Sequence, residues 1–279
     1  MFISLLLVLG AIFGGLFAMS RTIGVPAIYG TAMTPLARPH VYGRPERSIE
    51  EIRITAFYFV AKNKKDRIAD NWRDALEKNL AALADFHALQ LRGRSHISYR
   101  IYPAPVIGLE DNIFYDTDVT QRGNPHGLIH ISEELDRRAL RETGNLYDVG
   151  FAARPKNSYA SLFILYEGVG ASGGIIYESG EKSVEGIAAE TGLSPDVIFI
   201  VGVKNADGFF LLNREFLMGS YADIGGSLLA HEFYHTLGLP DGYTGTEATP
   251  TTSDIMGLGR MRPIERAYIG RETLENLGL

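Results

Sequence analysis

The sequence predicts an α/β fold built from layers of strands and helices. Short runs rich in β-branched and aromatic residues alternate with longer segments whose apolar residues recur every three or four positions. Such alternation is typical of layered α/β domains. At 279 residues, the chain is long enough for one large domain or two small lobes with a packed core.

The N-terminal half of the predicted fold contains two strands separated by a helix. Residues 52–60, IRITAFYFV, are β-branched and aromatic, which predicts a strand. Residues 71–91 place apolar side chains at steps of three and four, which predicts an amphipathic helix. Residues 96–106 alternate at first and predict a second strand that ends near its prolines.

Five further elements continue the alternation. We expect a helix at 131–143 and buried strands at 161–166 and 197–203. Residues 209–216 predict a shorter edge strand, and a helix that carries the polar motif described below begins near Tyr221.

The glycine-rich residues 167–181, EGVGASGGIIYESGE, predict a flexible surface loop that could border a cleft. No Lys followed by Ser or Thr completes a phosphate-binding loop there. We therefore expect no nucleotide site in this segment.

Composition excludes several classes of function. The net charge of −6 argues against nucleic-acid binding, because a phosphate-binding surface needs concentrated Lys and Arg. The chain has no cysteine, so disulfides, cysteine-ligated zinc and thiol catalysis are excluded. An acidic segment with Asp111, Asp116 and Asp118 leaves Ca²⁺ binding open. Its spacing matches no calcium loop, however, and a solvated loop is the preferred interpretation.

Residues 1–20 predict a signal peptide or an N-terminal membrane anchor. Residues 2–19 carry no charge, and this length fits the apolar region of a signal peptide or just spans a bilayer. No Lys or Arg precedes the apolar run. We expect an exported protein, either secreted after cleavage or held at the membrane by this segment alone. Residues 21–50, rich in Pro, Gly and Arg, predict a linker or a short pro-segment.

The segment GGSLLAHEFYHTLGLPDGY predicts a zinc site. Residues four apart lie on one face of a helix, so His231 and His235 would present both imidazoles to one point. Gly238 lies where the helix should end, and the turn would return Asp241 to the metal as the third ligand. Glu232 would then act as the general base on a water molecule. The alternative is a structural helix whose histidines pair locally, but the complete pattern rarely arises by chance.

This HExxHxxGxxD pattern resembles the signature of the metzincin clan of zinc endopeptidases. Residues 253–257, SDIMG, are similar to the clan's methionine-containing turn, which implies that Met256 supports the site from below without binding the metal. Aspartate in place of the commoner third histidine resembles the snapalysin and immune-inhibitor-A types of secreted protease. Asp254 is a rival to Asp241 for this role.

The chain also departs from some clan members just after the methionine turn. Some clan members carry a tyrosine just after the methionine turn, where it helps to bind the metal or to stabilise the oxyanion. Gly257 and Leu258 stand there in this chain. Tyr243 and Tyr268 are candidates for the role, although ordinary packing or surface tyrosines are the simpler interpretation.

The resemblance also implies a fold. Metzincins have a twisted mixed sheet with two long helices, the second of which carries the metal motif, and a small C-terminal subdomain that ends in a helix. Here this implies a catalytic domain at 51–279, with an upper lobe to about residue 238 and a lower lobe at 239–279. The clan binds extended substrates antiparallel to an edge strand, for which 209–216 is the candidate.

Together these features predict an exported or membrane-tethered zinc endopeptidase. We expect one catalytic Zn²⁺ ion, a protein or peptide substrate, and a monomer. One alternative is a non-catalytic, metal-stabilised binding or adhesion module, in which Glu232 would have no use. Another is a zinc hydrolase of a non-peptide amide, such as a cell-wall bond, whose metal ligands would be the same.

Overall fold

The chain divides into two compact units, at residues 1–37 and 38–279. The computed structural model describes residues 38–116, 127, 130–132, 134–135, 158–170, 172–176, 207–244, 249–250 and 252–279. All of them belong to the second unit. The predicted signal peptide or anchor at 1–20 therefore lies outside the described residues. Within the described part of the chain, no helix is long and apolar enough to cross a membrane.

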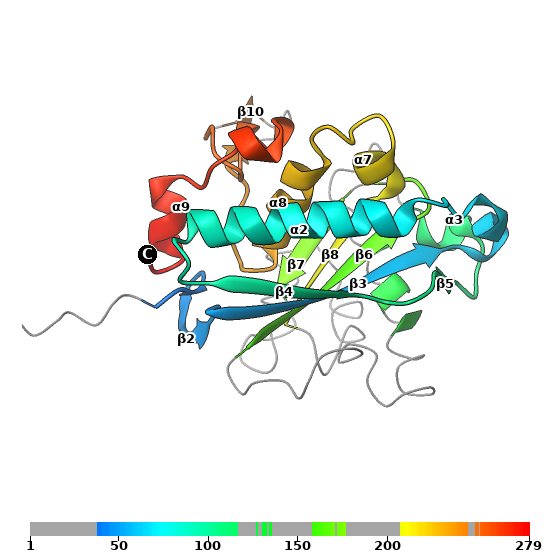
Figure 1. Ribbon diagram of the computed structural model, residues 1–279, viewed down its shortest axis with the longest axis horizontal. Coiled ribbons are helices and arrows are strands. Elements are labelled where there is room, and N and C mark those ends of the chain that lie inside the picture. Colours follow the sequence, from blue (N-terminus) through cyan, green and yellow to red (C-terminus); the bar gives the residue numbers. More distant parts are fainter. Residues whose placement is uncertain are drawn as a thin grey trace, which may run out of the picture. The chain divides into compact units, whose positions relative to one another are not determined.

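A mixed sheet forms the centre of this unit (Figure 1). Its strand order is β4-β3-β6-β8-β7, and the short strand β5 continues the pairing beside β3. All neighbouring strands run parallel except β7, which is antiparallel to β8. The strands are β3 (Glu51–Val60), β4 (His96–Ile101), β5 (Val106–Ile107), β6 (Tyr159–Tyr166), β7 (Gly173–Ile176) and β8 (Gly208–Asn213). The predicted α/β class is confirmed at this level.

Two helices pack on the same face of the sheet, α2 (Trp72–Gln90) and α8 (Gly225–His235) (Figure 1). The α2 helix buries residues at steps of three and four, beginning with Trp72, Leu76 and Leu80, as its sequence pattern predicts. The α8 helix is buried along almost its whole length, from Gly225 to Tyr234. A short helix, α7 (Arg214–Met218), connects the sheet to α8.

Both faces of the central strands are buried, which explains their continuous apolar sequences. On β3, Ile54, Ala56 and Tyr58 face the core under the helices. Phe57 and Phe59 point to the opposite face and are also fully buried. Parallel strands covered on both sides typically show such unbroken apolar runs rather than strict alternation.

Most of the predicted elements are confirmed with small changes of boundary. Strands occupy the segments expected at 52–60 and 161–166, and a helix occupies 71–91. The strand expected at 96–106 is interrupted and forms β4 and β5. Of the helix expected at 131–143, residues 131, 132, 134 and 135 are described and helical; its other residues, and the strand at 197–203, lie outside the described residues.

The predicted edge strand is wrong. Residues 208–213 form β8, an interior strand between β6 and β7, and residues 214–216 belong to α7. Among the described strands β7 is the terminal one, and it arises from the glycine-rich segment expected to be a loop. Gly174 explains the composition: a Cβ atom there would collide with the backbone carbonyl oxygen of Glu232 on α8. The strand can lie against the helix only where it lacks a side chain.

Part of the segment expected to be a linker at 21–50 belongs to the compact unit. It forms a two-stranded ribbon of β1 (His40–Val41) and β2 (Arg44–Ser48), and Val41 and Ile49 are fully buried. The amide of Tyr42 donates to the carbonyl of Leu237, 3.0 Å away, just beyond α8.

The chain after α8 consists of short elements. They are β9 (Tyr243–Thr244), β10 (Thr249–Pro250), the 3-10 turns η3 (Leu258–Met261) and η4 (Ile264–Arg266), and α9 (Arg271–Asn276). The amide of Ile269 donates to the side chain of Gln90, 2.9 Å away, which ties this part to the end of α2. Two further short elements follow β3 and β5, namely η1 (Lys62–Arg67) and α3 (Asn112–Tyr115).

Candidate metal centre

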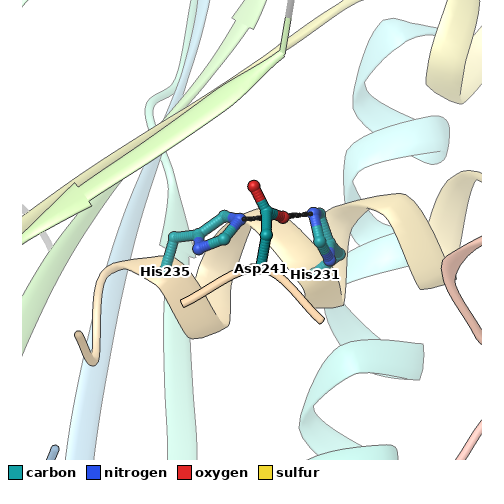
Figure 2. A group of neighbouring side chains, drawn as sticks. All are labelled: His231, His235 and Asp241. Carbon is teal, nitrogen blue, oxygen red and sulfur yellow. Dashed lines mark hydrogen bonds and ion pairs between the residues drawn. The ribbon is translucent and has the colours of Figure 1, made fainter. Parts of the chain in front are cut away.

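Three side chains converge at the C-terminal end of α8 (Figure 2). The Nε2 atoms of His231 and His235 are 3.2 Å apart. One carboxylate oxygen of Asp241, Oδ1, lies 3.2 Å from each of them. Among the described residues, no other group of three His, Cys, Asp or Glu residues could hold a metal ion. The structure thus brings together the three residues predicted to be ligands.

Local structure produces this convergence. The helix places His231 and His235 one turn apart on the same face. It ends at His235, and Gly238 then adopts a φ of 84°, a left-handed conformation that glycine enters without steric cost. The chain reverses there, and Asp241 returns beside the two imidazoles.

Backbone carbonyl groups fix the orientation of both imidazoles. The Nδ1 atom of His231 lies 3.0 Å from the carbonyl oxygen of Ile255, and that of His235 lies 2.8 Å from the carbonyl oxygen of Leu239. A carbonyl oxygen can only accept, so each Nδ1 carries the proton and each neutral ring turns its Nε2 lone pair toward the cluster. Metal-binding histidines are commonly held in this way.

The cluster fits a zinc ion in geometry and in chemistry. Two lone pairs and a carboxylate oxygen lie close together, an arrangement that a metal cation among them would stabilise. A tetrahedral Zn²⁺ about 2.0–2.1 Å from each ligand holds the ligand atoms about 3.3 Å apart, which agrees with the separations of 3.2 Å observed here. Two imidazoles and one carboxylate are also a donor set that zinc accepts with a fourth position left open.

Negative charge surrounds His235. Burial lowers the pKa of His235. In the protonated ring, however, Nε2 would donate to Asp241, and this bond and the negative charges of Glu232 and Asp241 outweigh the effect of burial. The net pKa is therefore raised above its ordinary value of 6.5. The same field attracts any cation, including a metal ion.

Glu232 lies next to the first histidine and is only 6 % exposed. Among the described residues, no donor forms a hydrogen bond with its carboxylate. A buried carboxylate without such a partner is costly. Such groups occur more often at functional sites than elsewhere, which makes Glu232 a candidate for a role in the chemistry of the site.

The turn at Ser253–Gly257 supports the cluster through its backbone. The carbonyl of Ile255 accepts from His231, and the carbonyl of Met256 accepts from the amide of Gly242, 2.7 Å away, next to Asp241. The side chain of Met256 is buried, at 3 % exposure. The segment predicted to be a methionine turn thus holds both the first and the third ligand.

Asp254 is not a metal ligand in this structure. Its Oδ1 accepts from the Thr252 hydroxyl at 2.8 Å and the Met256 amide at 3.1 Å. Its Oδ2 accepts from the Gly270 amide at 3.1 Å and the Thr273 hydroxyl at 2.6 Å. Both oxygens are engaged in these hydrogen bonds, which favours Asp241 over Asp254 as the candidate third ligand.

Neither predicted tyrosine is placed at the cluster. Tyr268 is 40 % exposed, and its hydroxyl forms a hydrogen bond with Ser253. The side chain of Tyr243 lies outside the described residues. Of the acidic segment considered for Ca²⁺, Asp116 accepts hydrogen bonds from Tyr166 and Val169, and Asp118 lies outside the described residues.

Sequence reasoning missed one residue of the site, Arg260. Its Nη1 lies 3.2 Å from Nε2 of His231 and 3.9 Å from Oδ1 of Asp241. The only signal in the sequence is a positive charge four residues after Met256, which no motif marks.

No protein-family model matches the chain, and no curated protein matches it significantly. The geometry and chemistry of the site itself therefore indicate the function.

Proposed function

We propose that this protein is a zinc-dependent hydrolase of peptide bonds with a metal centre of the metzincin type. The observation that carries the proposal is the three-atom cluster of His231, His235 and Asp241, with mutual separations of 3.2 Å, beside a buried carboxylate that has no donor among the described residues. A structural zinc site closes all four positions with protein ligands, whereas the described part of the chain supplies three here.

Each residue of the centre has a separate role in hydrolysis. When bound, zinc supplies Lewis acidity, which makes water acidic enough to lose a proton near neutral pH. Glu232 accepts a proton from the attacking water and donates it to the leaving amine nitrogen as the C–N bond breaks and the C–O bond forms. The carbonyl groups of Ile255 and Leu239 keep both histidines in the tautomer that binds metal.

A peptide substrate fits the position of β7. This strand is the last of the described strands in the sheet order, and it lies against α8, the helix that carries Glu232. Within the described sheet it pairs only with β8. An extended peptide can add to such an edge by backbone hydrogen bonds, which hold it beside the metal. The apolar residues 2–19 support an exported or membrane-tethered enzyme.

Two other functions share part of this evidence. A metal-stabilised binding module would use the same ligands but would have no role for Glu232. A hydrolase of non-peptide amides would share the whole centre, and only its substrate differs. The edge strand favours a peptide over the second alternative.

The test combines metal analysis with cleavage of a peptide library by the full-length chain. We expect one zinc ion per chain and cleavage that falls at least 100-fold in Glu232→Gln, because a general base contributes about 10²–10⁴-fold. The variant should still bind zinc, since Glu232 is not a ligand. Zinc binding without peptide cleavage, but with cleavage of cell-wall amides, would favour the non-peptide hydrolase. No hydrolysis of either substrate class would favour the binding module.

A further inference from the structure

A guanidinium group lies beside the metal ligands, where a zinc hydrolase does not need it for metal binding. The Nη1 atom of Arg260 is 3.2 Å from Nε2 of His231 and 3.9 Å from Oδ1 of Asp241. The side chain is 24 % exposed, so it is mostly enclosed. Arginine has no lone pair available for coordination and stays charged at all physiological pH values. It therefore cannot be a fourth ligand.

The backbone that carries Arg260 is fixed by the same turn that supports the metal ligands. The amide of Leu258 donates to the backbone carbonyl of Thr252 at 3.1 Å, and the amide of Gly259 donates to the backbone carbonyl of Asp254 at 2.7 Å. The amide of Arg262 donates back to Gly259 at 3.1 Å. These bonds form the 3-10 turn η3 and direct the side chain of Arg260 toward the cluster.

The charges of the loaded centre show what Arg260 would bind. The +2 charge of zinc is balanced by the two carboxylates, Asp241 and Glu232. Arg260 places a further positive charge beside these groups, with its Nη1 3.9 Å from Oδ1 of Asp241. Two cations this close repel each other unless an anion lies between them and contacts both. A centre of this kind binds anionic oxygen more strongly than one without the arginine.

We propose that Arg260 binds an anionic oxygen of the substrate beside the metal. The oxygen is either the one on which negative charge develops when the amide carbonyl is attacked, or an oxygen of a free carboxylate at the end of a peptide. The planar fork of a guanidinium suits both groups, because it can donate two parallel hydrogen bonds. This inference rests on the proposed function, since it assumes that zinc occupies the cluster.

Zinc affinity distinguishes substrate binding by Arg260 from a purely supporting role. If Arg260 only holds His231 and Asp241 in place, its loss should weaken zinc binding. If its role is to bind an anionic oxygen of the substrate, its loss should remove a positive charge near the metal and leave zinc binding unchanged or tighter. The sign of this change therefore separates the two roles without any measurement of activity.

The experiment compares Arg260→Gln, Arg260→Lys and the control Arg262→Gln in the full-length chain. Arg262 lies two residues away and is exposed, so this control removes the same charge from the same turn. Zinc affinity is measured by competition with a chelator. Anion affinity is measured by calorimetry on the zinc-loaded protein with two probes. One is a phosphinic peptide blocked at both ends, and the other is an N-acetylated dipeptide with a free carboxylate.

We expect Arg260→Gln to bind zinc at least as tightly as the parent and to lose about 10- to 100-fold in affinity for one probe or both, the usual effect of losing a hydrogen bond to a charged group. Arg260→Lys should lose less, and Arg262→Gln should resemble the parent. Weaker binding of the phosphinic peptide would identify the developing oxyanion as the group that Arg260 binds, and weaker binding of the dipeptide would identify a terminal carboxylate. If the affinity for the dipeptide falls, a dipeptide with a C-terminal amide in place of the carboxylate should bind equally poorly to parent and variant.

Two results would overturn the inference while the proposed function stands. One is weaker zinc binding in Arg260→Gln, and the other is unchanged affinity for both probes. A melting temperature close to that of the parent excludes misfolding as the cause, and Arg260→Lys provides the same test if the glutamine variant does not fold. A parent chain that binds no zinc would instead overturn the proposed function itself.

Discussion

Replacing Asp254 by Asn should loosen the whole supporting turn of the metal centre. Asp254 is 4 % exposed, and its carboxylate accepts four hydrogen bonds, two at each carboxylate oxygen. An asparagine amide keeps one oxygen and replaces the other with an NH₂ group. Whichever way it turns, that NH₂ faces a backbone N–H, of either Met256 or Gly270. Two hydrogen bonds to a charged acceptor are then lost or reversed.

The expected cost follows from these bonds. A hydrogen bond to a charged group contributes about 1.5–3 kcal/mol, so the loss of two should lower the free energy of unfolding by about 3–6 kcal/mol. Zinc affinity should also fall about 10- to 100-fold, as is usual when a partner behind the ligands is removed. The reason is that the adjacent Ile255 carbonyl orients His231.

Urea denaturation and chelator competition on the same preparation measure both effects. Asp111→Asn is a matched control, because it removes the same charge from an exposed position. We expect it to change the free energy of unfolding by less than about 0.5 kcal/mol. A loss below 1 kcal/mol in Asp254→Asn, or unchanged zinc affinity, would refute the view that this carboxylate organises the turn.

Two further predictions concern the sheet edge and the core. Gly174→Ala should push β7 away from the carbonyl of Glu232 and destabilise the fold by about 1–3 kcal/mol. Gly173→Ala is the control, because a Cβ there meets nothing within 4 Å, and it should have little effect on the urea midpoint. Equal midpoints for both variants would contradict the close approach of Gly174 to α8. Burial, and to a lesser degree the charge of His96, lowers the pKa of His87 to about 3. Between pH 6.5 and about 3, the unfolded chain therefore binds one proton more than the folded chain. The free energy of unfolding should fall on acidification by about 1.4 kcal/mol per pH unit across that window. His87→Gln should show a shallower dependence of stability on pH than the parent, and identical slopes would show that His87 does not titrate as described.

His87 also illustrates what sequence patterns leave open. It occupies the buried face predicted for the helix at 71–91, and that position is confirmed. Its partners come from elsewhere in the chain: Nδ1 lies 3.0 Å from the hydroxyl of Tyr234 on α8, and Nε2 lies 2.6 Å from the hydroxyl of Ser95. A periodic pattern specifies which face of a helix is buried but not which polar group meets it there.

The sequence alone determined the elements whose physics is local. The helix that carries His231 and His235, and the glycine turn that returns Asp241, follow from spacing within eleven residues, because helical periodicity and a left-handed glycine act over one or two turns. The strands at 52–60 and 161–166 follow from unbroken apolar composition in the same way.

Only the tertiary structure decided which distant segments meet. Strand order depends on pairing between residues far apart. Among the described strands, β8 therefore lies in the interior and the glycine-rich β7 comes last. The fit of Gly174 against α8, the hydrogen bonds of Asp254 and the approach of Arg260 to His231 depend on packing of the same kind. Backbone propensity carries no information about such contacts. Each contact depends on where the two residues lie in three dimensions, not on the residues next to them in the sequence.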